Sequence, residues 1–135
     1  MKSIQISLFA IAILVFSSLG CNKNKDCSID DQIQGEWVWL KSVGGIGGWT
    51  LTPESENITR KLIITDDIYR EYVNDSLVYE KNFVPGISKD KLIDTDVRTY
   101  IQFESGEKLA TKINGSDLEL IEQCIDCFKH YYTKK

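Results

Sequence analysis

The sequence predicts an all-β protein whose strands form an antiparallel up-and-down barrel of about eight strands. Three observations lead to this expectation. Short runs rich in β-branched and aromatic residues recur between residues 36 and 133. Most of these runs are separated by tight turns, which join antiparallel neighbours in a sheet. After residue 33, the apolar spacing that indicates a helix is almost absent.

The first half of the chain contains four expected strands. They are residues 36–43, 60–65, 68–74 and 77–84. Asp66-Asp67 and Asn74-Asp75-Ser76 are turn-forming sequences that separate the last three of these strands. Pro85-Gly86 then ends the fourth strand. We expect residues 86–95 to form a loop with a short extended piece.

The second half contains four more expected strands. They are residues 97–103, 108–113, 117–121 and 127–133. Ser105-Gly106, Asn114-Gly115 and the turn at 123–126 separate them, and Asn-Gly is the strongest short hairpin dipeptide. The last strand can pair with the first and so close the barrel. An eight-stranded barrel is either just filled by its side chains or holds one small ligand.

The first twenty residues predict a secretory signal peptide. Lys2 supplies a positive start, residues 8–16 form an apolar run too short to span a bilayer, and small residues precede Cys21. The sequence Ser18-Leu19-Gly20-Cys21 also resembles the bacterial lipobox, in which the cysteine is acylated and becomes the new N-terminus. We therefore expect residues 1–20 to be a lipoprotein signal, 21–33 to be a lipidated N-terminus and tether, and 34–135 to be the barrel domain. The alternative is an ordinary signal peptide that leaves Cys21 as a plain thiol.

Composition restricts the classes of partner. The formal net charge is -4, and the chain has no basic block or arginine-rich run, so a nucleic acid is a poor candidate. A hydrophobic fraction of 42% and only two prolines indicate a folded chain. Residues 21–135 suffice for one domain. By resemblance to better-known lipoproteins, Asn22 after Cys21 favours delivery to the outer membrane.

The cysteines leave more than one pairing open. With Cys21 lipidated, Cys27, Cys124 and Cys127 remain in surroundings that permit disulfides. Cys124 can pair with Cys127 across a turn, or Cys27 can pair with either of them. Cys27, Cys124, Cys127 and His130 also offer zinc ligands, but residues 127 and 130 point to opposite faces of one strand, and a second close cysteine pair is missing. We predict no metal and no cofactor.

The first strand resembles a known family. Gly35-Glu36-Trp37 matches the Gly-x-Trp sequence that opens the lipocalin barrel. Residues 35–53, GEWVWLKSVGGIGGWTLTP, and residues 124–134, CIDCFKHYYTK, resemble small lipocalin-like bacterial lipoproteins. The resemblance implies an eight-stranded barrel with an interior site for a small apolar molecule. It also implies that Gly35 permits a tight start of the barrel and that Trp37 closes its floor.

The glycine-rich segment 44–53 is the most distinctive loop. A phosphate-binding loop would need a Lys-Ser/Thr ending and a following helix, and neither is present. Long loops on rigid scaffolds often bind ligands. Trp39, Ile46 and Trp49 are therefore candidate ligand-binding or lid residues, and the alternative is a lid that only caps the core.

Catalysis has little support in the sequence. His130 lies on an expected strand between Lys129 and Tyr131, with no nucleophile motif and no acid placed to orient it. We therefore predict that the protein is not an enzyme. The expected function is that of a membrane-anchored, lipocalin-like lipoprotein of the cell envelope that binds a small hydrophobic ligand. The alternative is a filled barrel that docks another envelope protein.

Overall fold

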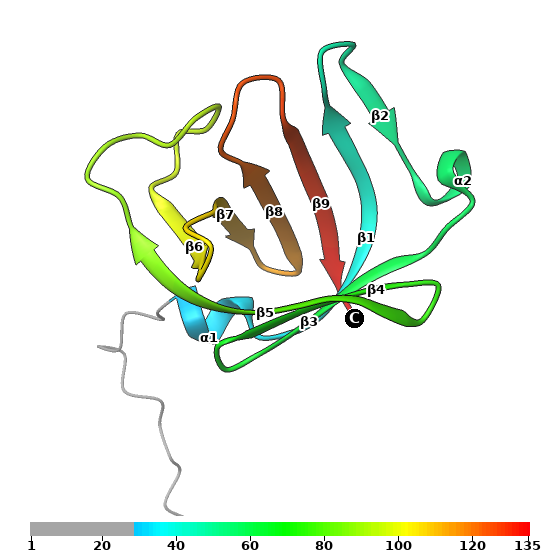
Figure 1. The fold of residues 1–135 in the computed structure, drawn as a ribbon, viewed down its shortest axis with the longest axis horizontal. Helices are drawn as coiled ribbons and strands as arrows, with labels where there is room; N and C mark the ends of the chain where they lie inside the picture. The colour runs from blue at the N-terminus through cyan, green and yellow to red at the C-terminus, as the bar shows by residue number, and fades with distance from the viewer. Residues whose placement is uncertain (1–28) are drawn as a thin grey trace, which may run out of the picture.

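Residues 29–135 of the chain are described here by a computed structural model (Figure 1). They form an almost entirely β structure. The elements are α1 (Ile29–Ile33), β1 (Gly35–Gly44), β2 (Trp49–Leu51), α2 (Pro53–Glu56), β3 (Arg60–Thr65), β4 (Ile68–Val73), β5 (Ser76–Ile87), β6 (Thr99–Phe103), β7 (Lys108–Asn114), β8 (Asp117–Glu122) and β9 (Phe128–Lys134). Neither of these helices is long and apolar enough to cross a membrane.

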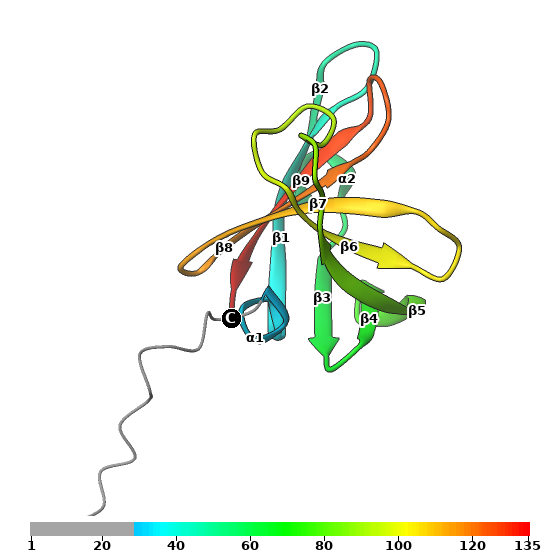
Figure 2. The same cartoon turned by 90° about the vertical axis from the view of Figure 1, so that its left-hand side faces the viewer.

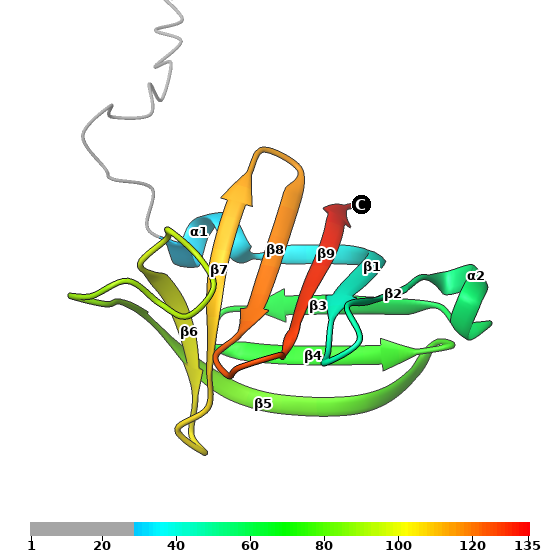
Figure 3. The ribbon, with the colours of Figure 1, turned by 90° about the horizontal axis from the view of Figure 1, so that it is seen from above.

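Eight of the strands close into an antiparallel barrel. Their order is β1, β3, β4, β5, β6, β7, β8 and β9, and pairing of β9 with β1 closes the circle. In Figure 3, strands β7 to β9 cross strands β3 to β5 at a steep angle, as expected of a small, strongly twisted barrel. Strand β2 lies outside the circle and pairs with the end of β1 at Ser42–Gly44. The predicted up-and-down barrel is confirmed.

The expected strands match the observed ones closely. Each of the eight predicted runs lies on one of the barrel strands, and the ends differ by a few residues. The three short elements α1, β2 and α2 were not expected. Thr52 caps α2 by accepting a hydrogen bond from the Ser55 amide, and the Ser55 hydroxyl accepts one from the Thr52 amide in return.

The core lies inside the barrel and extends from Ile33 and Trp37 beside α1 to Tyr69 and Tyr132. Strands alternate between inward and outward side chains, so each strand sends every second residue inside. The fully buried members include Trp37, Leu62, Ile64, Ile101, Leu118 and Leu120. The Trp37 indole N–H donates a 2.8 Å hydrogen bond to the Ile33 carbonyl. Gly35 enters β1 at φ +126°, a conformation that favours glycine. Gly35 thus begins β1, and Trp37 lies in the core close to α1.

Helix α1 belongs to the barrel rather than to the tether. It lies at the opposite end of the domain from the β1–β2 and β8–β9 loops (Figure 2). Ile33 is completely buried and packs in the core. The core thus includes Ile33, one residue before the expected start of the barrel domain at residue 34. This stretch is mostly polar, so its sequence shows no helical spacing of apolar residues. Ile33 is buried because it packs against the core of the folded barrel.

A bulge in β1 changes which of its residues face inward. The register with β9 shifts between Trp39 and Lys41, so Leu40 has no partner and stays exposed. Before the bulge Trp37 and Trp39 point inward, and after it Ser42 does, with only 2% of its surface exposed. The bulge therefore places a hydroxyl in the interior next to Trp39.

Candidate functional site

The half of the barrel farthest from α1 contains a cavity of about 280 Å³. Its walls come from β3 to β9, close to the β4–β5, β6–β7 and β8–β9 connections. The lining residues are Arg60, Tyr69, Glu71, Tyr79, Lys81, Phe103, Glu107, Leu109, Glu122, His130 and Tyr132. A larger hollow of 580 Å³ lies beside α1, and its lining combines acidic and amide side chains with Phe83, Val84 and Pro85. The inner cavity is the better candidate site because its side chains converge.

Aromatic rings form the inner wall of this cavity. Tyr69, Tyr79 and Phe103 pack edge to face, with ring centroids 5.4 to 6.0 Å apart. Tyr132 completes the wall and is almost fully buried, as is Tyr69. Burial raises the pKa of both tyrosines, so their hydroxyls stay protonated and neutral at physiological pH. The wall thus combines apolar ring faces with neutral hydroxyl groups.

Two cations lie on aromatic faces at the rim. The Arg60 guanidinium carbon is 5.0 Å from the centre of the Trp39 ring. The Lys81 ammonium is 4.6 Å from the centre of the Tyr79 ring and 5.9 Å from that of Phe103. A hydrogen bond with the Tyr79 side chain raises the pKa of Lys81, which therefore stays charged. Both cations are held by rings of the barrel interior.

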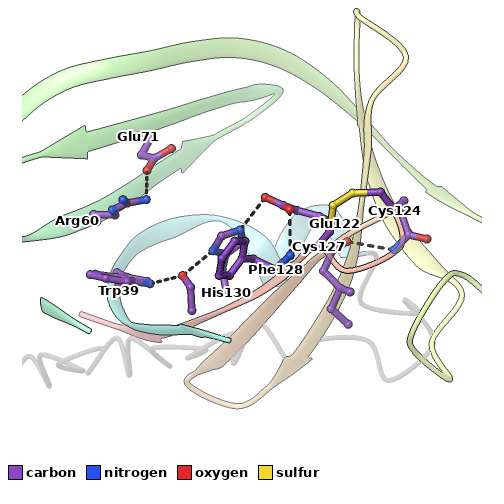
Figure 4. A network of polar contacts seen from close by, with 11 residues as sticks. Trp39, Arg60, Glu71, Glu122, Cys124, Cys127, Phe128 and His130 are labelled. Carbon is purple, nitrogen blue, oxygen red and sulfur yellow. Dashed lines mark hydrogen bonds and ion pairs between the residues drawn. A yellow bond between two sulfur atoms is a disulfide. The ribbon is translucent and has the colours of Figure 1, made fainter. Parts of the chain in front are cut away.

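A chain of hydrogen bonds runs beside the cavity (Figure 4). The Trp39 indole N–H donates to Ser42 Oγ at 2.9 Å, and Ser42 Oγ is 2.7 Å from His130 Nδ1. His130 Nε2 is 3.1 Å from Glu122 Oε1, and Glu122 Oε2 accepts the Phe128 amide at 3.0 Å. Because the indole can only donate, the Ser42 hydroxyl is free to donate to Nδ1. For a neutral His130 the remaining proton is then assigned to Nε2 and donated to Glu122.

The hydrogen bond with His130 also determines the charge of Glu122. That bond lowers the pKa of Glu122, and the Phe128 amide lowers it further, against the opposing effect of partial burial. Glu122 is therefore ionised at neutral pH. The expectation that no acid orients His130 was wrong. The two residues are eight positions apart in one hairpin, and both point inward, a pairing that hairpin register would have revealed.

This chain of contacts is suited to positioning rather than to nucleophilic chemistry. Both ring nitrogens of His130 already have partners, and Ser42 is buried beneath Trp39 and does not line the cavity. A nucleophile needs access to a substrate, and Ser42, which is only 2% exposed, lacks that access. The chain of contacts fixes Trp39, which in turn supports Arg60.

The β8–β9 loop next to the cavity is closed by a disulfide. Cys124 pairs with Cys127 at a Cα–Cα distance of 5.4 Å, which is one of the three pairings that the sequence left open. Cys21 and Cys27 lie outside the described residues. The Glu122 carboxylate and the two sulfurs lie within 4.8 Å of one another, and His130 is not part of that group. With both sulfurs in the disulfide, no thiolate remains there to bind a metal.

The predicted ligand or lid residues lie elsewhere. Trp39 is 98% buried in the core and carries Arg60 on its ring. Ile46 and Trp49 are 90% and 59% exposed, and neither lines the cavity. The Trp49 ring packs on its own loop, where a Cβ on Gly45 or Gly47 would lie under 3.0 Å from it. The glycines thus make room for Trp49 in its own loop.

Comparisons with known proteins do not identify the chain. No protein-family model matches it, and no curated protein or solved structure is significantly similar to it. Interpretation of the site therefore rests on its own geometry. The lining residues come from seven different strands, β3 to β9, and no local sequence motif connects them.

Proposed function

We propose that this protein is a membrane-anchored, lipocalin-like lipoprotein that binds a small, largely hydrophobic ligand in the open half of its barrel. The observation that carries the proposal is the cavity of about 280 Å³ with its aromatic wall. Known small-molecule pockets begin at roughly 300 Å³, so the cavity suits a small ligand. The other half of the barrel is filled by the core around Trp37 and Ile33.

The position of α1 supports binding from the aqueous side. Lipid on Cys21 would connect to the domain through Ile29, at the filled end of the barrel (Figure 2). The cavity lies at the other end. A molecule anchored in this way would present its cavity away from its own membrane, to ligands or partners in the adjoining aqueous space.

A second candidate function is docking of another envelope protein by the outer surface. Strand β5 carries the observation that favours it, because four of its apolar side chains are at least half exposed. They are Leu77, Val78, Val84 and Ile87. Exposed apolar patches on a soluble domain often mark interaction surfaces.

Binding of a hydrophobic fluorescent probe, displaced by extracted envelope lipids, tests the first proposal. Leu109 lines the cavity and is 7% exposed, so Leu109→Trp should fill the cavity and abolish probe binding. Leu40→Trp places the same ring on the outer surface, where Leu40 is 48% exposed, and should leave probe binding unchanged. A wild-type barrel that excludes every probe while co-purifying with an envelope protein would contradict ligand binding and favour docking.

The lipid anchor needs its own test. Cells that express the wild-type chain and are fed a radioactive fatty acid should yield labelled protein, and Cys21→Ala should remove the label. A wild-type chain without label, or a Cys21→Ala chain that keeps it, would contradict the anchor.

A further inference from the structure

We propose that the ligand is an amphiphile with one negatively charged group, and that Arg60 binds this group at the rim of the barrel. The inference rests on the proposed function, because it specifies the ligand class of the same cavity. It is carried by the incomplete hydrogen bonding of Arg60 and by the rigid support under its side chain.

Arg60 has bonding capacity that its neighbours leave unused. Its Nε is buried and has no hydrogen-bond partner among the described residues. Its nearest carboxylate is Glu71, with Nη1 and Oε1 3.7 Å apart, which is longer than a hydrogen bond. A guanidinium has five donors, and buried donors are nearly always paired in folded proteins. About a third of the side chain remains exposed at the cavity, so a ligand can reach the guanidinium.

The platform under Arg60 is fixed before any ligand arrives. The guanidinium lies on the Trp39 ring, and the indole is held by Ser42. Ser42 is held in turn by His130, and His130 by Glu122. A donor group that is already oriented loses little freedom on binding, which strengthens recognition of a planar anion. The buried polar chain thus acquires a role as a positioning device for Arg60.

The surrounding charges disfavour a doubly charged ligand, because three carboxylates and two cations line the cavity. Both oxygens of Glu122 already accept hydrogen bonds, from His130 and from the Phe128 amide. Lys81 adds a second cation at the same rim, where it lies on the Tyr79 ring. Glu71 and Glu107 also line the cavity, however, and would repel a doubly charged group. A carboxylate with an apolar body therefore fits better than a phosphate dianion.

Octanoate, octanol and octylamine test this inference because they share one chain and differ in charge. Calorimetric titration of the purified wild-type protein should give an affinity for octanoate at least about tenfold higher than for octanol, as expected for a charge-assisted hydrogen bond. Arg60→Met should bring that ratio close to one and leave octanol binding intact. Arg98→Met removes an exposed arginine that does not line the cavity, and should keep the wild-type ratio.

The outcomes separate this inference from the proposed function. Equal binding of octanoate and octanol, or preference for octylamine, would overturn the anionic ligand and leave a hydrophobic binding site in place. Failure of all three compounds and of the fluorescent probe would overturn both. The salt dependence of the wild-type protein gives a second measurement if Arg60→Met does not fold. Added salt should weaken octanoate and leave octanol unaffected, and equal salt effects on the two would overturn the inference.

Discussion

Replacement of Ser42 by alanine should destabilise the barrel more than the loss of one oxygen atom suggests. In the wild type, Ser42 Oγ accepts from Trp39 Nε1 at 2.9 Å and contacts His130 Nδ1 at 2.7 Å. The substitution leaves the Trp39 N–H without a partner in a residue that is only 2% exposed. A buried donor that loses its partner costs about 1–3 kcal/mol. The His130 side chain can bond to solvent in the cavity instead. Loss of the Ser42–His130 hydrogen bond therefore adds about 0.5–1.5 kcal/mol.

The expected decrease in the free energy of unfolding is therefore about 1.5–4.5 kcal/mol. Urea denaturation followed by tryptophan fluorescence and circular dichroism measures it, with the slope m checked for constancy. Trp39→Phe in the Ser42→Ala background removes the orphaned donor, so the two changes together should cost at least about 1 kcal/mol less than the sum of the single changes. A Ser42→Ala protein within about 0.5 kcal/mol of the wild type, or additive effects in the cycle, would refute the reasoning.

The other predictions concern the loops and the charge at the cavity. Replacement of Cys124 and Cys127 by serine opens a closed loop of four residues. Because the unfolded chain then gains conformational entropy, the free energy of unfolding should fall by about 2 kcal/mol. No change in the urea midpoint would contradict this. The pKa of Glu122 is lower in the folded chain than its usual 4.5, so Glu122 contributes stability above pH 4.5 and loses it as the pH falls through the folded pKa. Glu122→Gln should therefore flatten this part of the acid denaturation curve. An unchanged curve would count against the Glu122–His130 interaction. Gly44→Ala places a Cβ 2.2 Å from a backbone oxygen, whereas the Cβ of Gly48→Ala meets nothing within 4 Å. The first substitution should therefore lower the melting temperature far more than the second. Equal shifts would show that the backbone moves to relieve the clash.

The β-rich runs and their turns predicted the strands because each signal is local. Asn74 and Asp75 adopt positive φ values of 49° and 63°, a conformation that suits the predicted tight hairpin between β4 and β5. The Asn114-Gly115 turn was predicted in the same way, and Gly115 adopts a positive φ of 61°. The conformation of such a turn depends on a few neighbouring residues, so a short stretch of sequence is enough to predict it.

The residues of the cavity could not be predicted in the same way. Arg60 lines the cavity from β3 and Glu71 from β4. Tyr132 lines it from β9, the last strand of the chain. Alternation shows that each points inward, but it does not show at what height along the barrel. That height depends on strand register and on bulges such as the one at Leu40 in β1. Trp49 was expected to bind a ligand or cover the barrel because it stands out in the glycine-rich sequence. In the folded chain its ring packs on its own loop, and it does not line the cavity.

The amino-acid sequence by itself determined the strands, most of the turns and the all-β class, because alternation and turn chemistry act between residues close in the chain. Only the tertiary structure decided that Ile33 plugs one end, that Glu122 orients His130, and that Arg60 lies on Trp39 with its hydrogen bonding incomplete. These contacts form between strands whose relative heights are set by the closure of the whole barrel, and closure is a property of all eight strands together.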